Sequence, residues 1–467
     1  MDDASRLIIT DAMIQTPMGL VRGDVVVEDG QIHDIAPGGG SEIPEGAHHV
    51  EATGLHLLPG IIDPQVHFRE PGQPEKEDLA SGSAAAASGG VTSFLDMPNN
   101  NPSATTLASM RAKLDSAARK CVTHHGFFIG ATPTNLDDLI EAVGTPEAPV
   151  AHPGICGIKI FMGSSTGDLL VNGESSLRAI FEGTAGLIAV HAEDEARLIE
   201  RRATIEGRTD MAAHAEWRDD ECALLATKLA VRLAEETGHR LHVLHLTSGL
   251  EASWLKGRTG RPSDGARITV ETCPQHLTFD DEDVAREGTR LKMNPPIRYA
   301  SDKAGLWKGL QEGTIQCIAT DHAPHTLEAK SLGFPMAPSG MPGVESSLPV
   351  MLDHVNAGRC TLAQVSRWMS EHVAECYGMV GKGRIEIGAD ADLVLVDLNL
   401  SIQVEDEHTW TRVGWSPYRG RTLKGWPVLT IVDGIPVFER TEHTGPKGRI
   451  LVEPGTVGRP LTMLPWT

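Results

Sequence analysis

Eight short apolar segments recur through the middle of the chain, separated by stretches of helical character. The segments span residues 61–68, 91–97, 124–130, 157–162, 187–193, 241–247, 268–274 and 315–323. Helix candidates between them, such as residues 76–88 and 219–236, are Ala-rich or amphipathic and contain no proline. Alternating strands and helices predict an α/β fold with a parallel sheet, and eight repeats predict a (β/α)₈ barrel of the TIM type.

The two ends of the chain have a different pattern. Residues 6–58 contain short alternating segments broken by Gly, Pro and Asp, and residues 384–398 and 427–439 repeat this pattern. Such segments are typical of β-hairpins. We therefore predict a small discontinuous β-sandwich domain formed by residues 1–58 and 383–467, and a catalytic barrel formed by residues 59–382. A chain of 467 residues is long enough for both units.

Charge and composition exclude several classes of function. The chain has 41 Lys and Arg against 63 Asp and Glu, a formal net charge of −22, so its average surface repels nucleic acid and anionic membranes. No apolar run approaches the roughly 18 residues of a membrane span, and the acidic start is unlike a signal peptide. The seven cysteines lack CxxC spacing, which indicates reduced thiols. We expect a cytoplasmic protein, and an anionic small-molecule substrate is compatible with a locally basic pocket.

Several polar residues lie at the C-terminal ends of the apolar segments. They are His67, Asn99, Lys159, His191, His245 and Asp321. A single histidine is more often structural, but several strand ends converge on one mouth of a (β/α)₈ barrel, and this convergence favours a metal site there. Lys159 lies among apolar residues in GIKIFM, where burial disfavours the charged ammonium.

The motifs around these residues resemble the amidohydrolase superfamily and, within it, the dihydroorotases. They cover nearly the whole chain, in the order LPGIIDPQVHFREPG, KEDLASGSAAAASGGVTSFLDMPNNNP, GIKIFMGSSTG, VHAEDE, LHLTS, TCPQHL, MNPPIR, TDHAPHT and GADADLVLVD. The resemblance implies one or two divalent ions, expected to be zinc. His67 and Asp321 would hold one ion, His191 and His245 the other, and Lys159 would bridge them as a carbamate. It further implies that Asp321 moves a proton from the attacking water to the departing amide nitrogen.

One residue departs from the family pattern. The family has His-x-His where this chain has Gln65, Val66 and His67. An amide oxygen is a weaker and harder ligand than an imidazole nitrogen. Gln65 therefore leaves open whether one or two metal ions bind.

Arg69 is the residue that bears most on the substrate. It follows His67 by two residues, and its planar guanidinium can bind a carboxylate through paired hydrogen bonds. The alternative is a structural salt bridge with Glu70 or Glu75.

Further residues match family positions that contact the substrate. They are Asn99, Asn294 and His325, together with Ser339 and Gly340 in a loop over the pocket. Either asparagine could equally be a turn residue, since both lie near proline.

Three functions are consistent with the motifs. The first is a dihydroorotase, which interconverts L-dihydroorotate and N-carbamoyl-L-aspartate in de novo pyrimidine (UMP) biosynthesis. Arg69 favours it, because hydantoin and allantoin lack a ring carboxylate. The second is a hydantoinase- or allantoinase-like hydrolase of another cyclic ureide.

The third is a catalytically silent homologue that acts as a structural partner, for instance of aspartate transcarbamoylase. Gln65 supports this third reading, whereas the presence of all five expected ligands opposes it. The resemblance also implies a homo-oligomer, dimeric or tetrameric, and contacts with other pyrimidine-pathway enzymes.

Overall fold

A parallel barrel forms the centre of the protein. The computed structural model describes residues 6–163 and 167–464. Eight strands pair in chain order, each parallel to the next: β6 (Ile61–Val66), β7 (Val91–Asp96), β8 (His124–Gly130), β11 (Ile155–Phe161), β12 (Leu187–His191), β13 (Arg240–Val243), β14 (Ile268–Thr272) and β15 (Cys317–Ile318). A parallel bridge between Val66 and His322 joins the last segment to the first. The predicted (β/α)₈ fold is confirmed, and each of the eight predicted segments overlaps one strand.

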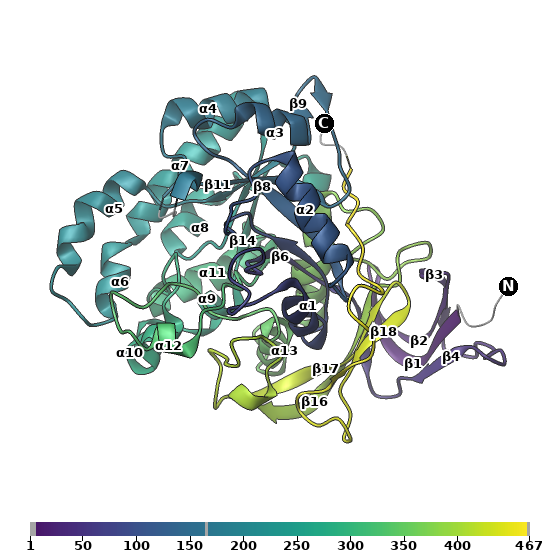
Figure 1. The fold of residues 1–467 in the computed structure, drawn as a ribbon. Helices are drawn as coiled ribbons and strands as arrows, with labels where there is room; N and C mark the ends of the chain where they lie inside the picture. The colour runs from purple at the N-terminus through teal and green to yellow at the C-terminus, as the bar shows by residue number, and fades with distance from the viewer. Residues whose placement is uncertain (1–5, 164–166, 465–467) are drawn as a thin grey trace.

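Helices surround the barrel (Figure 1). The longer ones are α1 (Leu79–Ser88), α2 (Leu107–Ala118), α3 (Leu136–Val143), α4 (Glu174–Gly183), α7 (Asp220–Thr237), α11 (Ala300–Glu312) and α13 (Ser347–Asn356). The shorter ones are α5 (Glu195–Arg201), α6 (Ala212–Trp217), α8 (Gly249–Leu255), α9 (Pro274–Thr278), α10 (Asp281–Glu287), α12 (Leu327–Lys330), α14 (Leu362–Ser366) and α15 (His372–Tyr377), and a small hairpin pairs β9 (Gly144–Thr145) with β10 (Ala148–Pro149).

Local signals in the sequence fix the ends of α7. The Asp219 side chain accepts a hydrogen bond from Cys222 N at the start of the helix, and Gly238 ends it with a φ of 70°. A capping carboxylate and a left-handed glycine are the ordinary start and stop signals of a helix.

Both ends of the chain contribute to one β-sheet beside the barrel (Figure 1). The N-terminal strands are β1 (Arg6–Thr16), β2 (Gly19–Glu28), β3 (Gln31–Pro37), β4 (His48–Glu51) and β5 (His56–Pro59), and the C-terminal strands are β16 (Leu393–Gln403), β17 (Thr422–Val432), β18 (Ile435–Glu439) and β19 (Arg449–Ile450). The order is β19-β18-β17-β16-β5-β1-β2-β3, with β4 also paired to β1. Antiparallel pairing of β5 with β16 joins the two ends. Hydrogen bonds therefore join the two chain ends of the predicted β-sandwich domain in one sheet. The domain boundaries at 58/59 and 382/383 stay predictions.

The last described residues leave the sheet and return to the barrel. Pro460 bridges to His125 of β8, and Leu461 O accepts a hydrogen bond from Gly154 N. Leu461 and Met463 are buried in one apolar cluster with Leu95, Phe128 and Cys156. The C-terminal segment therefore belongs to the barrel core in its packing.

A buried ionic network joins the barrel to the sheet. Lys382 Nζ lies 2.6 Å from Asp392 Oδ2, and His124 Nε2 lies 3.2 Å from Asp392 Oδ1. The side chains of His124, Asp392 and Asp433 lie close enough together to hold a metal ion. The Lys382 ammonium already supplies the positive charge there, 2.9 Å from Asp390 as well.

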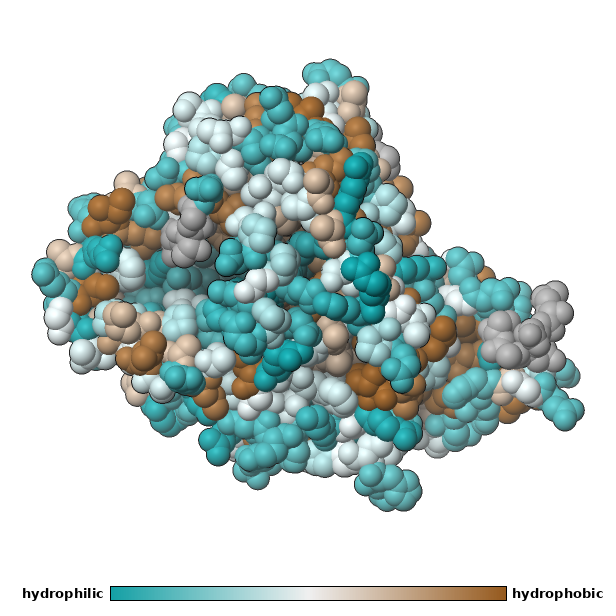
Figure 2. All heavy atoms as spheres, in the orientation of Figure 1, coloured by the Kyte–Doolittle hydropathy of each residue, from teal (hydrophilic) through white to brown (hydrophobic). Residues whose placement is uncertain are grey.

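The visible face of the molecule is mostly hydrophilic, and its apolar residues form small separate groups (Figure 2). Among the described residues, no helix combines the length and apolar character needed to cross a bilayer.

Candidate active site

A cavity of about 720 Å³ opens where the barrel strands end. Its walls contain Gln65 and all eleven residues singled out from the sequence: His67, Arg69, Asn99, Lys159, His191, His245, Asn294, Asp321, His325, Ser339 and Gly340. The folding of the barrel brings them together, because β6, β11 and β12 end here and the segments after β13 and β15 turn into the same space.

The expected metal ligands form two adjacent pairs. His67 Nε2 lies 3.0 Å from Asp321 Oδ1, and His191 Nδ1 lies 2.9 Å from His245 Nε2. His245 and Asp321 have φ angles of 35° and 49°. Such values are uncommon outside glycine and recur at functional sites.

The second nitrogen of each leading histidine is already engaged. His67 Nδ1 lies 2.6 Å from Asn99 Oδ1, and His191 Nε2 lies 2.8 Å from Glu193 Oε2. Because these outer nitrogens face acceptors, they carry the ring protons. The inner nitrogens then present lone pairs to Asp321 and to His245, as metal-binding histidines do.

Among Gln65 and the five expected metal ligands, three buried polar atoms have no hydrogen-bond partner in the described structure. They are Lys159 Nζ, His245 Nδ1 and Gln65 Oε1. Buried polar atoms are ordinarily paired, so their convergence with the lone pairs of His67 and His191 fits one or two cations. The amide nitrogen of Gln65 donates to Asp321 Oδ1 at 3.0 Å, which leaves Oε1 as the atom suited to a metal.

Lys159 is fully buried, and its ammonium group lies 4.5 Å from the centre of the Phe161 ring. Burial lowers the pKa of Lys159 to about 7, although Asp321 and Glu271 oppose the shift. The neutral amine is the form that reacts with carbon dioxide, so this environment suits the expected carbamate.

Arg69 is a buried cation, 9% exposed, in the cavity wall. Its Nε donates to Pro324 O at 3.4 Å, and a terminal nitrogen lies 3.4 Å from His325 Nε2. The alternative salt bridge with Glu70 does not form, because that carboxylate pairs with Lys120 and Ser116. Among the described residues, no carboxylate forms an ion pair with Arg69.

The two asparagines have defined side-chain partners. Asn99 accepts from His67, and Asn294 Oδ1 accepts from His214 Nε2 and Arg218 Nε, each at 3.0 Å. Neither is a simple turn residue. Their proposed contacts with substrate stay predictions.

Gly340 is required by its loop. It has a φ of 127°, and a Cβ atom there would lie 2.4 Å from Ala323 O. A side chain at this position would both strain the backbone and displace the neighbouring wall of the cavity. With Ser339, Gly340 thus forms a closely fitted part of the cavity.

Sequence reasoning missed Glu193, which lies in the acidic run that follows His191. Glu193 is fully buried between His191 and Arg218, and α5 begins only at Glu195. Although burial alone would raise the pKa of Glu193, Arg218 and His191 hold it at about 2. The sequence signal that could have identified Glu193 is its position two residues after the predicted ligand His191.

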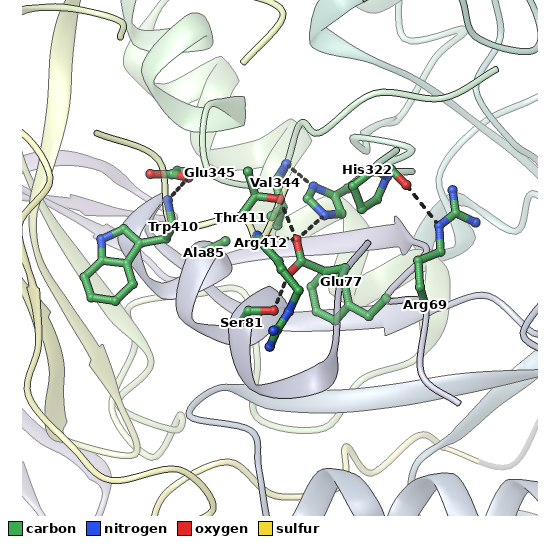
Figure 3. Close-up of polar contacts among 12 residues, drawn as sticks. Arg69, Glu77, Ser81, Ala85, His322, Val344, Glu345, Trp410, Thr411 and Arg412 are labelled. Atoms are coloured by element: carbon green, nitrogen blue, oxygen red, sulfur yellow. Dashed lines mark hydrogen bonds and ion pairs between the residues drawn. The ribbon is translucent and has the colours of Figure 1, made fainter. Parts of the chain in front are cut away.

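A second missed group is centred on Glu77 and on His322, which follows Asp321 in the sequence (Figure 3). His322 is fully buried, and its Nδ1 accepts from the amides of Gly343 and Val344 at 3.0 and 3.2 Å. Its Nε2 lies 3.5 Å from Glu77 Oε2, and its carbonyl accepts from His67 N at 2.7 Å. His322 therefore connects Glu77 to the predicted ligands His67 and Asp321.

Glu77 also ties the β-domain to this site. Its carboxylate accepts hydrogen bonds from the Ser81 and Thr411 hydroxyls and from Arg412 N, the last at 3.2 Å (Figure 3). Thr411 and Arg412 lie between β16 and β17. Glu77 and His322 stand in the motifs KED and DHAP. The sequence does not indicate, however, that their side chains meet.

Comparisons with known proteins agree on the type of enzyme and differ on its substrate. Residues 56–437 match the amidohydrolase family. An allantoinase of Streptomyces avermitilis is 35% identical over 451 residues, 95% of this chain and 98% of that protein. A dihydroorotase of Methanosarcina acetivorans is 34% identical over 435 residues, 91% and 90% of the two chains. The solved structure of an L-hydantoinase (dihydropyrimidinase) from Arthrobacter aurescens superposes with a TM-score of 0.88 at 28% identity, covering 98% of this chain and 99% of that one.

Proposed function

This chain belongs to the amidohydrolase family, and from that premise we propose that it is a dihydroorotase. It would hydrolyse the ring amide of L-dihydroorotate to N-carbamoyl-L-aspartate and catalyse the reverse ring closure in pyrimidine biosynthesis. The named relatives all act on cyclic amides, and the chain is a metal-dependent cyclic amide hydrolase like them. The proposal therefore concerns the choice of substrate.

Arg69 is the observation that carries this choice. A buried guanidinium is costly unless an acceptor compensates its charge. Among the described residues, Arg69 has one long hydrogen bond to Pro324 O and one contact to His325. The ring carboxylate of dihydroorotate supplies the missing counter-charge. Allantoin and hydantoin supply none, so they would leave Arg69 unpaired.

Overall similarity gives the alternative its support, since the 35% identical relative is an allantoinase. Identity over a whole chain, however, is dominated by the barrel and the ligands that these enzymes share. Substrate choice depends on a few side chains in the cavity, and Arg69 is the one that discriminates by charge. A silent homologue is disfavoured, because the expected ligands remain assembled around one cavity.

The side chains of the cavity fit one or two divalent ions, for which we propose zinc. His67, Asp321 and the amide oxygen of Gln65 would hold one ion. His191 and His245 would hold the other, and Lys159 as a carbamate would join the two sites. A bound ion would polarise the scissile carbonyl and make the attacking water acidic near neutral pH.

Asp321 is then the proton carrier. Its carboxylate accepts the proton of the attacking water and delivers it to the ring nitrogen as the carbon–nitrogen bond breaks. A hydrogen bond from the Gln65 amide to Oδ1 holds this carboxylate in place. Arg69, with Asn99 and His325 beside it, would hold the substrate carboxylate and so orient the ring amide.

A substrate panel tests the proposal. Purified protein is assayed with L-dihydroorotate, allantoin and hydantoin, and its metal content is measured on the same sample. We expect dihydroorotate to be preferred, with at least one zinc-like ion per chain. Preference for allantoin or hydantoin would refute the substrate assignment, and active protein without metal would refute the mechanism.

Two variants of Arg69 sharpen the test. Two charge-assisted hydrogen bonds contribute roughly 3 to 6 kcal/mol, so Arg69→Met should lower kcat/KM for dihydroorotate by about 10² to 10⁴. Arg69→Lys keeps the charge but not the paired geometry and should lose less. Equal kcat/KM in Arg69→Met and wild type would remove Arg69 from substrate binding.

A further inference from the structure

Two buried lysines lie behind the loop that forms one wall of the cavity. Lys292 and Lys330 are 7% and 1% exposed. Within the described chain, neither forms an ion pair with a carboxylate. Burial, together with Arg218 beside Lys292 and Lys292 beside Lys330, lowers the pKa of Lys292 to about 8 and that of Lys330 to about 7. Buried ammonium groups without a counter-charge are rare, because desolvation is costly.

Both ammonium groups bind backbone carbonyls of residues 335–340. Lys292 Nζ donates to Pro335 O at 2.8 Å and to Ala337 O. Lys330 Nζ donates to Pro338 O at 3.0 Å, to Gly340 O at 2.7 Å and to Lys292 O at 2.9 Å. Three carbonyl acceptors engage three N–H groups at Lys330 Nζ and so favour the ammonium form, in contrast to Lys159 Nζ, which has no such partner. The carbonyl dipoles of the loop point toward the lysines.

The loop held in this way faces the proposed substrate. Pro338, Ser339 and Gly340 line the cavity beside Arg69 and His325. Gly340 N donates to Lys292 O at 2.9 Å. The loop therefore both accepts hydrogen bonds from the lysine side chains and donates one to the backbone of Lys292. A shift of either lysine would move this wall.

This side of the cavity is basic, in contrast to the whole protein. Arg69 and Lys76 lie in the wall, and Lys292 and Lys330 lie behind the loop. Among the described lining residues, Asp321 is the one acid. A chain of net charge −22 thus places unpaired positive charge at one wall of its cavity, which is the arrangement that attracts and holds an anion.

We propose that Lys292 and Lys330 are positioning residues that set the preference for anionic over neutral cyclic amides. Their ammonium groups fix residues 335–340 and add a positive field behind the substrate carboxylate. This inference rests on the proposed function, because it takes the substrate to be a carboxylate.

Charge and structural support can be separated by substitution with glutamine. Lys330→Gln retains an amide that donates hydrogen bonds to the loop but removes the charge. Its kinetics are compared on L-dihydroorotate and on 5,6-dihydrouracil, which has the same ring without the carboxylate. We expect KM for dihydroorotate to rise about tenfold with kcat within about twofold, and the kcat/KM for dihydrouracil to change little.

Lys303→Gln is the matched control, since Lys303 pairs with Asp280 outside the cavity and should leave both substrates unaffected. Circular dichroism and thermal unfolding verify the fold of each variant. If Lys330→Gln does not fold, Lys292→Gln decides, because Lys292 Nζ makes two of these contacts rather than three.

Each outcome is decisive. An unchanged KM for dihydroorotate, or an equal loss on both substrates, would overturn the inference while wild-type turnover of dihydroorotate upholds the proposed function. Wild-type preference for dihydrouracil over dihydroorotate would overturn both.

Discussion

Replacing Asp392 by Asn removes a buried negative charge at the junction of barrel and sheet. The wild-type carboxylate accepts from Lys382 Nζ at 2.6 Å, from His124 Nε2 at 3.2 Å and from Asp433 N at 2.9 Å. An asparagine keeps one oxygen, but its NH₂ group must face another donor, either the Lys382 ammonium or the His124 ring. The variant therefore leaves a buried cation partly uncompensated.

Breaking one partner of a buried ion pair costs about 3 to 5 kcal/mol. Lys382 retains Asp390 at 2.9 Å, so the lower end applies and we expect a loss of about 3 kcal/mol. This loss corresponds to a change of about 100-fold in the unfolding equilibrium.

The size of the loss depends on pH through two groups. Although burial would raise the pKa of Asp392, His124 and Lys382 hold it well below its ordinary value of 3.8. Its contribution is therefore present above pH 3.8 and is lost as the pH falls through the lower folded value. Burial would lower the pKa of His124, but Asp392 and Asp433 raise it above 6.5. That contribution is present below pH 6.5 and is lost as the pH rises through the higher folded value.

The difference between wild type and variant should therefore be largest between pH 3.8 and 6.5. Equilibrium urea unfolding, followed by tryptophan fluorescence at about pH 5.5 and about pH 8.5, measures it. Glu439→Gln is the control, because it removes an exposed pair with Arg449 and should cost below about 1 kcal/mol. A loss below about 1 kcal/mol for Asp392→Asn at pH 5.5, or a larger loss at pH 8.5, would refute the reasoning.

Three further predictions concern the cavity. Glu77→Gln removes the carboxylate facing His322 and should lower kcat about tenfold with KM within about twofold, because a displaced catalytic group is slow even when substrate binds normally; an unchanged kcat contradicts this. Gly340→Ala places a methyl group 2.4 Å from Ala323 O and should raise KM about tenfold in steady-state assays, whereas a wild-type KM would show that the loop is not fitted to the substrate. Chelation should abolish turnover and lower Tm, with both restored by Zn²⁺, and full activity after verified metal removal would exclude metal dependence.

The barrel could be predicted because its signals are local. Each strand is a short apolar run, and the polar residue that ends it is adjacent in sequence. His67, Lys159 and His191 could therefore be assigned to one mouth before any contact was known. The eighth strand shows the limit, since residues 315–323 contain only the two-residue β15, and Asp321 then takes a φ of 49°.

What could not be predicted depends on contacts between distant segments. Nothing near Glu77 indicates that it meets Thr411, 334 positions away. In the sequence, Lys330 resembles an ordinary exposed lysine at a helix end. Only the structure shows that its ammonium group binds three backbone carbonyls. Glu193 resembles its solvated neighbours, and only the position of Arg218 reveals why it is buried. Such pairings follow from tertiary packing and leave no periodic trace in the sequence.

The bridge between Val66 and His322 has a consequence for how the protein is made. His67 and Asp321 lie 254 positions apart and meet where the first and last barrel segments join. Glu77 likewise accepts a hydrogen bond from Thr411, which is made much later. During synthesis the ribosome delivers the first ligand long before the last. The predicted metal site therefore cannot be complete before Asp321 has been made, and the surroundings of Glu77 cannot be complete before Thr411 has been made.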